Sequence, residues 1–471
     1  MKQRRIVLVL SLVMVLALFA VSVKAQDMPS PQVNVGDQLV LGGFVTIDSI
    51  YSEGPGYVVI HRASDGAQVG VSQPLNAGWT NNLRITLDTS LAEAQMSAML
   101  HVDDNAIGTY EFGTVEGADG PVKVGDAIVN TLFNAQVLDA GDQKVVDNSI
   151  TIKSVAVPVD SWVVVHSGDA AKFGGVLGQT LVKAGTAADV KVALSGDLTS
   201  VLWPMLHVDD GVAGTYEFAG GEIDAPVVLN GAVATFPIWT VNHLRVNDQA
   251  VVHGDNMTQM EGMEMAGPSI RIKSVLSEGP GIVVIHANDN GNAGAILGAA
   301  FVEDGVTNNV DVQLDTSGGL TPIVWPMLHI DAGTVGVYDG LDVDGVASAD
   351  GQPVTFTTNA APALVMADQA IGADGTITIK NAIMDAPGWI AIHSDNNGAP
   401  GPVIATALLH TGANWNVKIA VDAAAAGAKV FPMLHYDTNT PGTYEFGSVD
   451  GADAPVFVQG NVVVGPLSIT Q

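Results

Sequence analysis

The sequence predicts an all-β protein in which four tandem immunoglobulin-like antiparallel β-sandwich domains follow an N-terminal signal peptide. The first observation behind this prediction is a set of motifs that occurs four times, with starting points 105, 106 and 120 residues apart. The second is that short β-rich runs alternate with Gly, Asp, Asn and Pro inside each unit. The third is that 47% of the 471 residues are hydrophobic, which is enough to give each unit its own core.

Residues 1–25 have the three parts of an export signal. They comprise a basic start at 2–5, an almost uninterrupted apolar run at 6–21, and the small residues Val23 and Ala25 for a signal peptidase. We expect cleavage after Ala25; an uncleaved anchor is less favoured because the apolar run is near the lower limit for a membrane span. No second apolar stretch of spanning length follows. The mature chain is predicted to be soluble and either secreted or held at the cell surface, with the periplasm as a further option.

The charge of the chain disfavours several classes of partner. It has 18 Lys and Arg against 49 Asp and Glu, a formal net charge of −31, which becomes −35 once the four basic residues of the signal are removed. Nucleic acid and anionic membranes require clustered Lys and Arg, so neither is an expected partner. No cysteine is present, which excludes disulfides and thiolate metal sites. Stability must come from the cores or from bound ions, and divalent cations suit so many carboxylates.

The repeat boundaries follow from the recurring motifs. Each unit opens with Asp-Gln and later contains a Leu-His-x-Asp segment, followed by Gly-Thr-Tyr-Glu-Phe or, in the third unit, by Gly-Val-Tyr-Asp. The third unit is longer, mainly because of a methionine-rich insertion at 256–267. We therefore expect β-sandwich repeats at 33–136, 137–241, 242–361 and 362–471.

The fourth repeat illustrates the strands that we expect. They lie at 376–380, 389–393, 403–409, 416–421, 430–436, 443–446 and 456–464, whereas an alanine run at 423–426 is ambiguous. So many short strands, several of them apolar on both faces, indicate two packed antiparallel sheets. The Gly-Thr-Tyr-x-Phe motif resembles the tyrosine corner of immunoglobulin-like Greek keys, in which the Tyr hydroxyl hydrogen-bonds back across the arch. The match is partial, since Phe stands where a Cys would follow.

Together these motifs resemble an uncharacterised domain that occurs in tandem in exported and surface proteins of archaea and some bacteria. In that family a Val-Val-Val-His strand, as at 163–166 here, is similarly followed by a Met/Pro-x-His-x-Asp segment and a loop leading to Thr-Tyr. The resemblance covers nearly all of the mature chain and implies an exported repeat domain. It implies nothing about chemistry, because the family carries no known activity.

Eight of the eleven histidines occupy two repeated positions, and they raise a first metal hypothesis. Side chains alternate along a strand, so His207 and Asp209 share one face, as do Trp162 and His166 on the earlier strand. If the two strands are neighbours, two imidazoles and a carboxylate could form a Zn²⁺ or Cu²⁺ site, although a structural role that fixes strand register is favoured. The candidate ligands are His61, His101 and Asp103; His166, His207 and Asp209; His286, His329 and Asp331; and His393, His435 and Asp437.

The loop after the second histidine raises a different metal hypothesis. In repeat 4, Asp437 and Asn439 place oxygen donors at alternate positions ahead of Gly442, and Glu445 lies three residues further on. Hard oxygen ligands with a Gly at the turn are typical of Ca²⁺ loops, although none of these loops has the full EF-hand pattern. Asp and Asn also populate turns for their own backbone hydrogen bonds, and we favour that interpretation. Of the metals, Ca²⁺ is favoured over Zn²⁺ or Cu.

Two further hypotheses are weaker. Four methionines of the insertion lie close to His253, and thioethers suit Cu(I), although they could equally form an adaptable contact surface. For catalysis, the sequence has no Gly-x-Ser-x-Gly elbow, His-Glu-x-x-His helix or phosphate-binding Gly-Lys-Ser/Thr loop. Paired carboxylates for glycoside hydrolysis stay open, since any of the 49 acidic side chains could converge.

The sequence therefore favours a non-catalytic exported repeat protein. We expect a structural or adhesive spacer of the cell surface or matrix, built from rigid β-sandwiches, with a surface or matrix component as its partner. The alternative is an extracytoplasmic metal-binding protein that holds Ca²⁺ at the acidic loops, or Zn²⁺ or Cu at the histidine sets. A more remote alternative is an enzyme that acts on an extracellular polymer.

Overall fold

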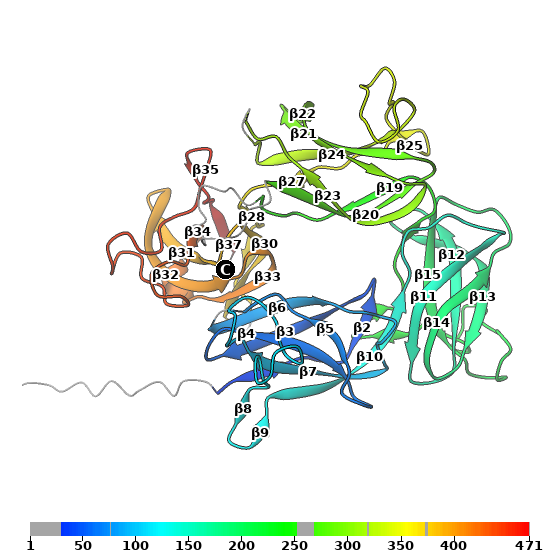
Figure 1. Cartoon of the computed structure of the whole chain (residues 1–471). Coiled ribbons are helices and arrows are strands. Elements are labelled where there is room, and N and C mark those ends of the chain that lie inside the picture. The colour runs from blue at the N-terminus through cyan, green and yellow to red at the C-terminus, as the bar shows by residue number, and fades with distance from the viewer. Residues whose placement is uncertain (1–29, 76, 252–267, 318–319, 373–374, 471) are drawn as a thin grey trace, which may run out of the picture.

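The computed structural model describes residues 30–75, 77–251, 268–317, 320–372 and 375–470, and almost every element in it is a β-strand (Figure 1). Each repeat is a sandwich of a three-stranded and a four-stranded layer, and two of these layers, one from repeat 1 and one from repeat 2, share a strand and form one continuous seven-stranded sheet. The prediction of an all-β fold with four tandem sandwiches is confirmed. The predicted signal peptide and the methionine-rich insertion, with His253, lie outside the described residues.

Within each sheet, neighbouring strands pair in the following order. The three-stranded sheets are β1 (Gln32–Asn34), β3 (Phe44–Ser52) and β6 (Gly78–Thr86); the second half of β10 (Asn130–Asp139), β11 (Ser149–Val157) and β14 (Gly185–Ala193); β19 (His243–Val246), β20 (Ser269–Ser277) and β23 (Gly305–Gln313); and β28 (Ala363–Val365), β30 (Thr376–Met384) and β33 (Gly412–Ala420). The four-stranded sheets are β5 (Gln68–Val71), β4 (Gly56–Arg62), β7 (Gln95–Val102) and the first half of β10; β13 (Phe173–Val182), β12 (Ser161–Gly168), β15 (Val201–Val208) and β18 (Ile238–Trp239); β22 (Asn292–Val302), β21 (Gly281–Asp289), β24 (Ile323–Ile330) and β27 (Thr358–Asn359); and β32 (Ala399–Leu409), β31 (Gly388–Asn396), β34 (Lys429–Tyr436) and β37 (Leu467–Thr470).

Short additional strands complete the repeats. β2 (Gln38–Leu41) pairs in parallel with β10, and β29 (Gln369–Ala370) pairs in parallel with β37. Each repeat also has a small hairpin: β8 (Lys123–Val124) with β9 (Ala127–Ile128), β16 (Val228–Leu229) with β17 (Ala232–Val233), β25 (Ser348–Ala349) with β26 (Gln352–Pro353), and β35 (Phe457–Val458) with β36 (Asn461–Val462).

The path of the chain through the two sheets is of the immunoglobulin type. In repeat 3 the first, second and fifth strands (β19, β20, β23) form one sheet, and the fourth, third, sixth and seventh (β22, β21, β24, β27) form the other. Immunoglobulin constant domains pair the fourth strand with the fifth, whereas here the fourth strand pairs with the third. The long hairpin of β21 and β22 results from this difference.

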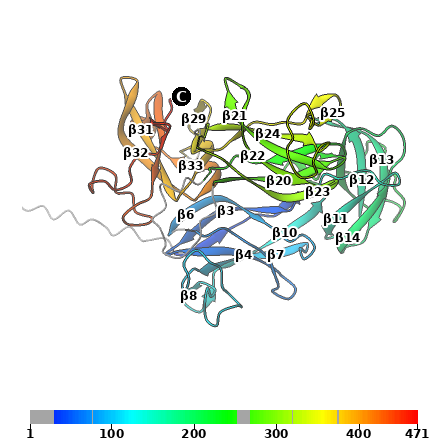
Figure 2. The same ribbon diagram turned by 45° about the horizontal axis from the view of Figure 1, so that its top comes forward.

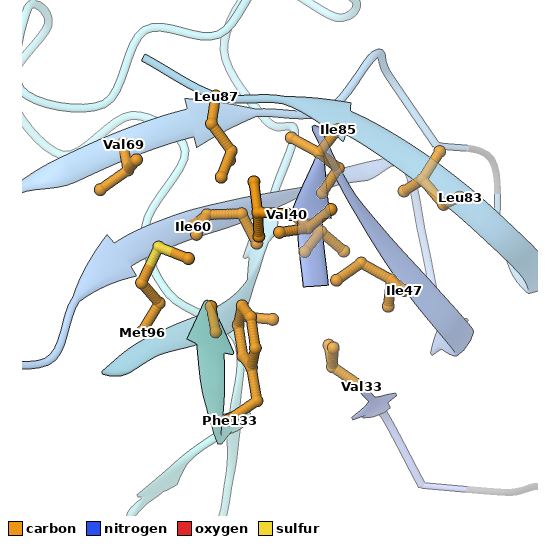
Figure 3. Close-up of a cluster of buried hydrophobic side chains, with 14 of the residues drawn as sticks. Val33, Val40, Ile47, Ile60, Val69, Leu83, Ile85, Leu87, Met96 and Phe133 are labelled. Atoms are coloured by element: carbon orange, nitrogen blue, oxygen red, sulfur yellow. The ribbon is translucent and has the colours of Figure 1, made fainter. Parts of the chain in front are cut away.

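Alternation along the strands builds a separate core in each repeat. In β20, Ile270 and Ile272 are buried between the sheets while Lys273 is exposed on the outer face. Figure 3 shows the equivalent cluster of repeat 1, in which Ile60 and Phe133 of the four-stranded sheet meet side chains of the other sheet. Four such clusters, one per repeat, make each sandwich a unit with its own hydrophobic core.

The central strands of the four-stranded sheets are buried on both faces, because a long loop folds back over the outer face. In repeat 2 residues 161–166 of β12 are all buried, and His207 of β15 forms an isolated bridge with Pro226 at the far end of that loop. We call this segment the covering loop, and it spans 103–121, 209–226, 331–346 and 437–455 in repeats 1 to 4.

The covering loop is where the expectations from sequence fail. The strand predicted at 443–446 is wrong, because only Phe446 makes an isolated bridge there, and 456–464 is a hairpin rather than one strand. The tyrosine corner is wrong as well: Tyr216 follows the sixth strand, and its hydroxyl lies 3.4 Å from Nδ1 of His207 instead of contacting a backbone group. The alanine run forms the one-turn helix α1 (Ala423–Ala426). No helix in the described ranges is long and apolar enough to cross a membrane.

The four repeats close on themselves (Figures 1 and 2). β10 runs from repeat 1 directly into repeat 2, and three residues separate β18 from β19 and β27 from β28. Repeat 4 then meets repeat 1, where β33 lies beside β6 and the side-chain amide of Asn82 donates to the carbonyl of Asn416 at 2.7 Å. The chain therefore does not extend as a row of separate domains.

Candidate functional site

The two repeated histidines of each unit lie on the outer face of the four-stranded sheet, beneath the covering loop. The strands that carry them are neighbours, since Trp162 pairs with His207 and His166 pairs with Trp203. The two imidazole rings stack side by side on the sheet, with centroids 6.0 Å apart in this repeat. The structure forms the same pair in every repeat, with centroid distances of 5.8 Å for His61–His101, 6.0 Å for His286–His329 and 5.9 Å for His393–His435.

Each of the eight imidazoles makes the same kind of hydrogen bond through Nδ1. The first histidine faces a glycine carbonyl, as His166 faces Gly174 at 3.0 Å, and the second faces an aspartate carbonyl, as His207 faces Asp224 at 2.7 Å. A carbonyl oxygen can only accept, so Nδ1 carries the hydrogen and Nε2 keeps its lone pair. The other bonds are His61 to Gly66, His101 to Asp119, His286 to Gly294, His329 to Asp344, His393 to Gly401 and His435 to Asp453.

Burial keeps the second histidine of each repeat uncharged. The Nε2 atoms of all eight are buried and have no hydrogen-bond partner among the described residues. The second histidines of the repeats are His101, His207, His329 and His435. Removal from water lowers the pKa of each, and this effect outweighs the hydrogen bond to the carbonyl, which raises the pKa. These imidazoles are therefore neutral at pH 7 and act as hydrogen-bond donors that hold the loop to the sheet.

The aromatic residues of the Gly-Thr-Tyr-x-Phe motif pack over the second histidine. In repeat 2 the rings of Tyr216 and Phe218 lie with centroids 5.7 Å and 5.0 Å from that of His207, both edge to face. Tyr216 also contacts Trp162 at 5.5 Å. Edge-to-face contacts of this kind stabilise buried aromatic clusters. The motif thus closes a second small core on the outer face of the sheet.

A buried aspartate near the end of each covering loop was missed by sequence reasoning. The carboxylate of Asp224 is fully buried and accepts the backbone N–H groups of Asp210 at 3.0 Å and Glu217 at 2.5 Å. Its carbonyl receives His207, so this one residue ties both arms of the loop to the sheet. The equivalents are Asp119, Asp344 and Asp453, and all but Asp344 have a left-handed backbone.

The aspartates proposed as partners of the histidines instead hold the turn of the covering loop. Asp209 accepts the backbone N–H of Gly214 at 3.0 Å and the indole N–H of Trp162 at 3.1 Å. Asp437 makes the same two bonds, to Gly442 and Trp389. Asp103 and Asp331 accept only the glycine N–H, and their second oxygens are buried without a partner in the described chain.

The donors proposed for Ca²⁺ are also engaged within the loop. In repeat 4, Glu445 accepts the backbone N–H of Thr440 at 2.9 Å and the side-chain amide of Asn439 at 2.8 Å. Asn439 presents a nitrogen donor to this carboxylate and has a left-handed backbone, with φ of 65°. These contacts are those of an Asx-rich turn whose carboxylates satisfy its own N–H groups.

This geometry does not favour either metal hypothesis. Two imidazoles lie side by side in each repeat, but the aspartate predicted as the third ligand instead accepts a backbone N–H of the loop. The described residues contain no group of three or more His, Asp or Glu side chains placed to hold a metal ion.

The Asp-Gln motif that opens each repeat joins its two sheets. In repeat 2 the side chain of Gln143 pairs with the backbone of Thr151 in β11, accepting its N–H at 2.8 Å and donating to its carbonyl at 2.9 Å. Asp142 accepts the N–H of Trp239 in the four-stranded sheet at 2.9 Å. The glutamine thus acts as one more strand residue, and the aspartate fastens the edge of the other sheet.

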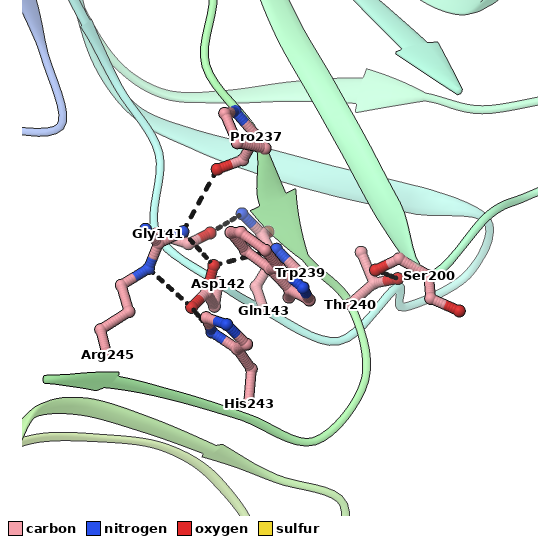
Figure 4. Close-up of polar contacts among 9 residues, drawn as sticks. All are labelled: Gly141, Asp142, Gln143, Ser200, Pro237, Trp239, Thr240, His243 and Arg245. Atoms are coloured by element: carbon pink, nitrogen blue, oxygen red, sulfur yellow. Dashed lines mark hydrogen bonds and ion pairs between the residues drawn. The ribbon is translucent and has the colours of Figure 1, made fainter. Parts of the chain in front are cut away.

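The aspartate of this motif has an additional role between repeats 2 and 3 (Figure 4). Asp142 is buried and receives Nδ1 of His243 at 2.9 Å and Nε of Arg245 at 2.7 Å, both from β19. Burial alone would raise the pKa of Asp142, but the hydrogen bonds from His243 and Arg245 outweigh it and lower the pKa. The ring of Trp239 stacks on His243 with a centroid distance of 3.9 Å. A buried charge thus links the two sandwiches.

The repeats match a known sequence family. The family described as "Domain of unknown function (DUF7282)" matches residues 31–135, 136–237, 256–361 and 362–470. The chain belongs to this family. Its four copies confirm the resemblance to an uncharacterised tandem-repeat domain.

Two more distant similarities are to a cell surface glycoprotein and to a large adhesion protein. Over 107 residues the chain is 36% identical to Cell surface glycoprotein 2 of Haloarcula hispanica, a match that covers 22% of this chain and 11% of that protein. A solved structure described as a tetra-tandem repeat in the extending region of a large adhesion protein is 13% identical. The match covers 94% of this chain and 100% of the chain in that structure, with a TM-score of 0.15.

Proposed function

We propose that this chain is a non-catalytic exported protein of the cell surface, in which four DUF7282 sandwiches form a structural or adhesive module. The observation that carries the proposal is that the repeated polar residues serve their own repeat. The histidines, the loop carboxylates and the Asp-Gln pair hold a loop or a sheet edge in place. Side chains that make these hydrogen bonds within their own repeat stabilise a rigid scaffold.

The similarity to a cell surface glycoprotein supports the proposed location. The signal peptide expected at residues 1–25 agrees with it, because surface proteins must be exported. The charge of −31 suits a protein that stays soluble and does not bind nucleic acid.

The covering loops supply the contact points of the module. In repeats 1 to 3 each loop exposes a large aliphatic residue close to its turn glycine: Ile107 is 66% exposed, Val212 58% and Val335 76%. In repeat 4 the turn glycine Gly442 instead lies against Ala77 of repeat 1. Exposed apolar side chains on rigid loops are suited to contacts with another surface.

The location is tested by protease treatment of intact producing cells, with a protease that does not cross the envelope. We expect peptides from all four repeats to be released. Recovery of the full chain only from the cytoplasm after lysis would overturn the proposal.

The metal alternative is tested by a thermal melt of the purified chain with and without EDTA. Because the loop carboxylates already accept backbone N–H groups, we expect the melting temperature to stay the same within error. A lower melting temperature with EDTA, together with bound Ca²⁺ in elemental analysis, would replace the structural assignment of these loops by the calcium-binding one.

A further inference from the structure

A hollow of about 430 Å³ lies where repeats 1, 3 and 4 meet. It is formed by the outer faces of their three-stranded sheets, with β6 of repeat 1, β20 and β23 of repeat 3 and β33 of repeat 4 around it (Figures 1 and 2). The closed arrangement of the repeats creates this space, and none of the three sandwiches forms it alone.

The charge of the hollow is opposite to that of the chain. Three cations line it, Arg84, Arg271 and Lys273, against one carboxylate, Asp248. The whole chain carries a formal charge of −31. Clustered cations in a concave site raise the local concentration of anions, because the surrounding protein focuses their field.

Two of the three cations form no ion pair within the described part of the chain. Arg271 makes a bidentate pair with Asp311, at 2.7 and 2.6 Å. Arg84 lies over the ring of Phe44, with its guanidinium carbon 3.5 Å from the centroid, and neither it nor Lys273 forms an ion pair with any described residue.

Lys273 lies among other charged groups. Lys273 is exposed to the hollow, but the surrounding protein removes part of its water and lowers its pKa, and the charges of Arg245 and Arg84 lower it further. The charges of Asp139 and Asp142 oppose this effect only in part. The carboxylate of the hollow, Asp248, accepts the N–H of Asn359 at 2.9 Å. An anion bound between Lys273 and Arg84 would relieve the repulsion.

The remaining lining groups suit a ligand larger than an inorganic ion. The side chains of Gln73 and Asn309 face the hollow and make no hydrogen bond with the described residues, and the indole of Trp415 is half-buried there. Amide groups and an aromatic face are the usual partners of hydroxyl groups and of an apolar ring face, and the volume falls in the range of small-ligand sites.

We propose that this hollow binds an anionic saccharide, whose carboxylate or sulfate group lies between Lys273 and Arg84. Trp415 contacts the sugar ring, and Gln73 and Asn309 bind its hydroxyl groups. The site requires three repeats, so it is a property of the assembled chain.

The repeats provide a matched control. Lys273 is the fifth residue of the second strand of its repeat, and the fifth residue of the equivalent strand in repeat 4 is Lys380, which is exposed and does not line the hollow. Lys273→Met and Lys380→Met therefore make the same chemical change, one inside the site and one outside it, and both keep the apolar stem of the lysine.

The test is calorimetric titration of the secreted chain at constant ionic strength with D-glucuronate, D-galacturonate, N-acetylglucosamine 6-sulfate, D-glucose and sodium sulfate. We expect at least one of the acidic sugars to bind and D-glucose not to. Lys273→Met and Arg84→Gln should each weaken that binding about ten-fold or more, whereas Lys380→Met should leave it unchanged.

Three results would overturn the proposal: no binding of any acidic sugar, equal affinity for sodium sulfate, or binding that is insensitive to both variants in the hollow. Thermal melts of the variants confirm that they are folded, so that lost binding is not lost structure. The surface role proposed above does not depend on the outcome.

Discussion

Asp224 shows how a single residue organises the covering loop. Its carboxylate accepts two backbone N–H groups from opposite arms of the loop, and its carbonyl accepts the imidazole of His207. Its backbone is left-handed, with φ of 49°, a conformation that Asp and Asn tolerate better than most residues. The sequence contains a signal for it, since Asp lies between small or apolar residues just before Pro-Val or Val-Ala in all four repeats. The chemistry of the side chain alone does not distinguish Asp224 among the 49 acidic residues.

We expect Asp224→Asn to lower the free energy of local opening of the covering loop by about 2 kcal/mol, because one buried backbone N–H loses its acceptor. Asn keeps the left-handed backbone favourable, so the change isolates the carboxylate. Native-state hydrogen exchange of residues 209–226, read by mass spectrometry, measures this free energy. Asp210→Asn, at an exposed carboxylate of the same loop, is the control. Equal exchange in the two variants would show that Asp224 does not hold the loop.

The buried histidines should make the loops sensitive to acid. Burial holds the pKa of His207 below its ordinary value of about 6.5, and the neighbouring His166 acts in the same direction. The opened state then binds the proton more readily, so the stability of the loop is complete above about pH 6.5 and falls as the pH decreases below that value. Hydrogen exchange of residues 209–226 at pH 7.5 and 5.5, corrected for the intrinsic pH dependence of exchange, should show this loss. In His207→Gln the difference between the two pH values should shrink, and an unchanged difference would contradict the assignment.

At the scale of elements, the regular strands were predictable and the covering loop was not. Alternating or continuous apolar runs such as 389–393 and 430–436 correspond to β31 and β34, because burial in a sheet leaves a pattern in the sequence. The sequence of the covering loop has no regular spacing of apolar residues. Its structure depends on side-chain to backbone bonds between residues up to 18 positions apart, such as His101 to Asp119, which local patterns do not report. The same features that resembled a calcium site and a tyrosine corner are explained by these internal bonds.

Tyr216 tests this interpretation of the loop. A tyrosine corner would make the hydroxyl important, but here it lies 3.4 Å from an Nδ1 atom that already donates to the carbonyl of Asp224. We therefore expect Tyr216→Phe to change the free energy of loop opening by less than about 0.5 kcal/mol. Tyr216→Ala removes the ring from Trp162 and His207 and should cost about 2 kcal/mol. Hydrogen exchange of residues 209–226 compares the two variants, and a cost of more than about 1 kcal/mol for Tyr216→Phe would restore the importance of the hydroxyl.

At the scale of the whole molecule, the linkers alone did not reveal the closed arrangement of the repeats. The recurring motifs predict four tandem sandwiches, but they do not predict how the sandwiches are arranged relative to one another. The buried cluster of Asp142, His243 and Arg245 fixes the angle between repeats 2 and 3 instead. Contacts of this kind occur at one junction and do not recur in every repeat, so no repeated motif indicates them.

The closed arrangement can be tested with introduced cysteines, because the chain has no native cysteine to interfere. The side chain of Asn82 in repeat 1 donates to the backbone of Asn416 in repeat 4, so thiols in Asn82→Cys/Asn416→Cys should be joined within one molecule by a short bis-maleimide. Asp189 occupies the same left-handed position on β14, the fifth strand of repeat 2. β14 lies away from β6 in both views of the molecule (Figures 1 and 2), so the pair Asn82→Cys/Asp189→Cys is the control. Peptide mapping identifies the cross-link. If neither pair is joined although all thiols react with N-ethylmaleimide, repeats 1 and 4 do not meet, and the chain is an extended row after all.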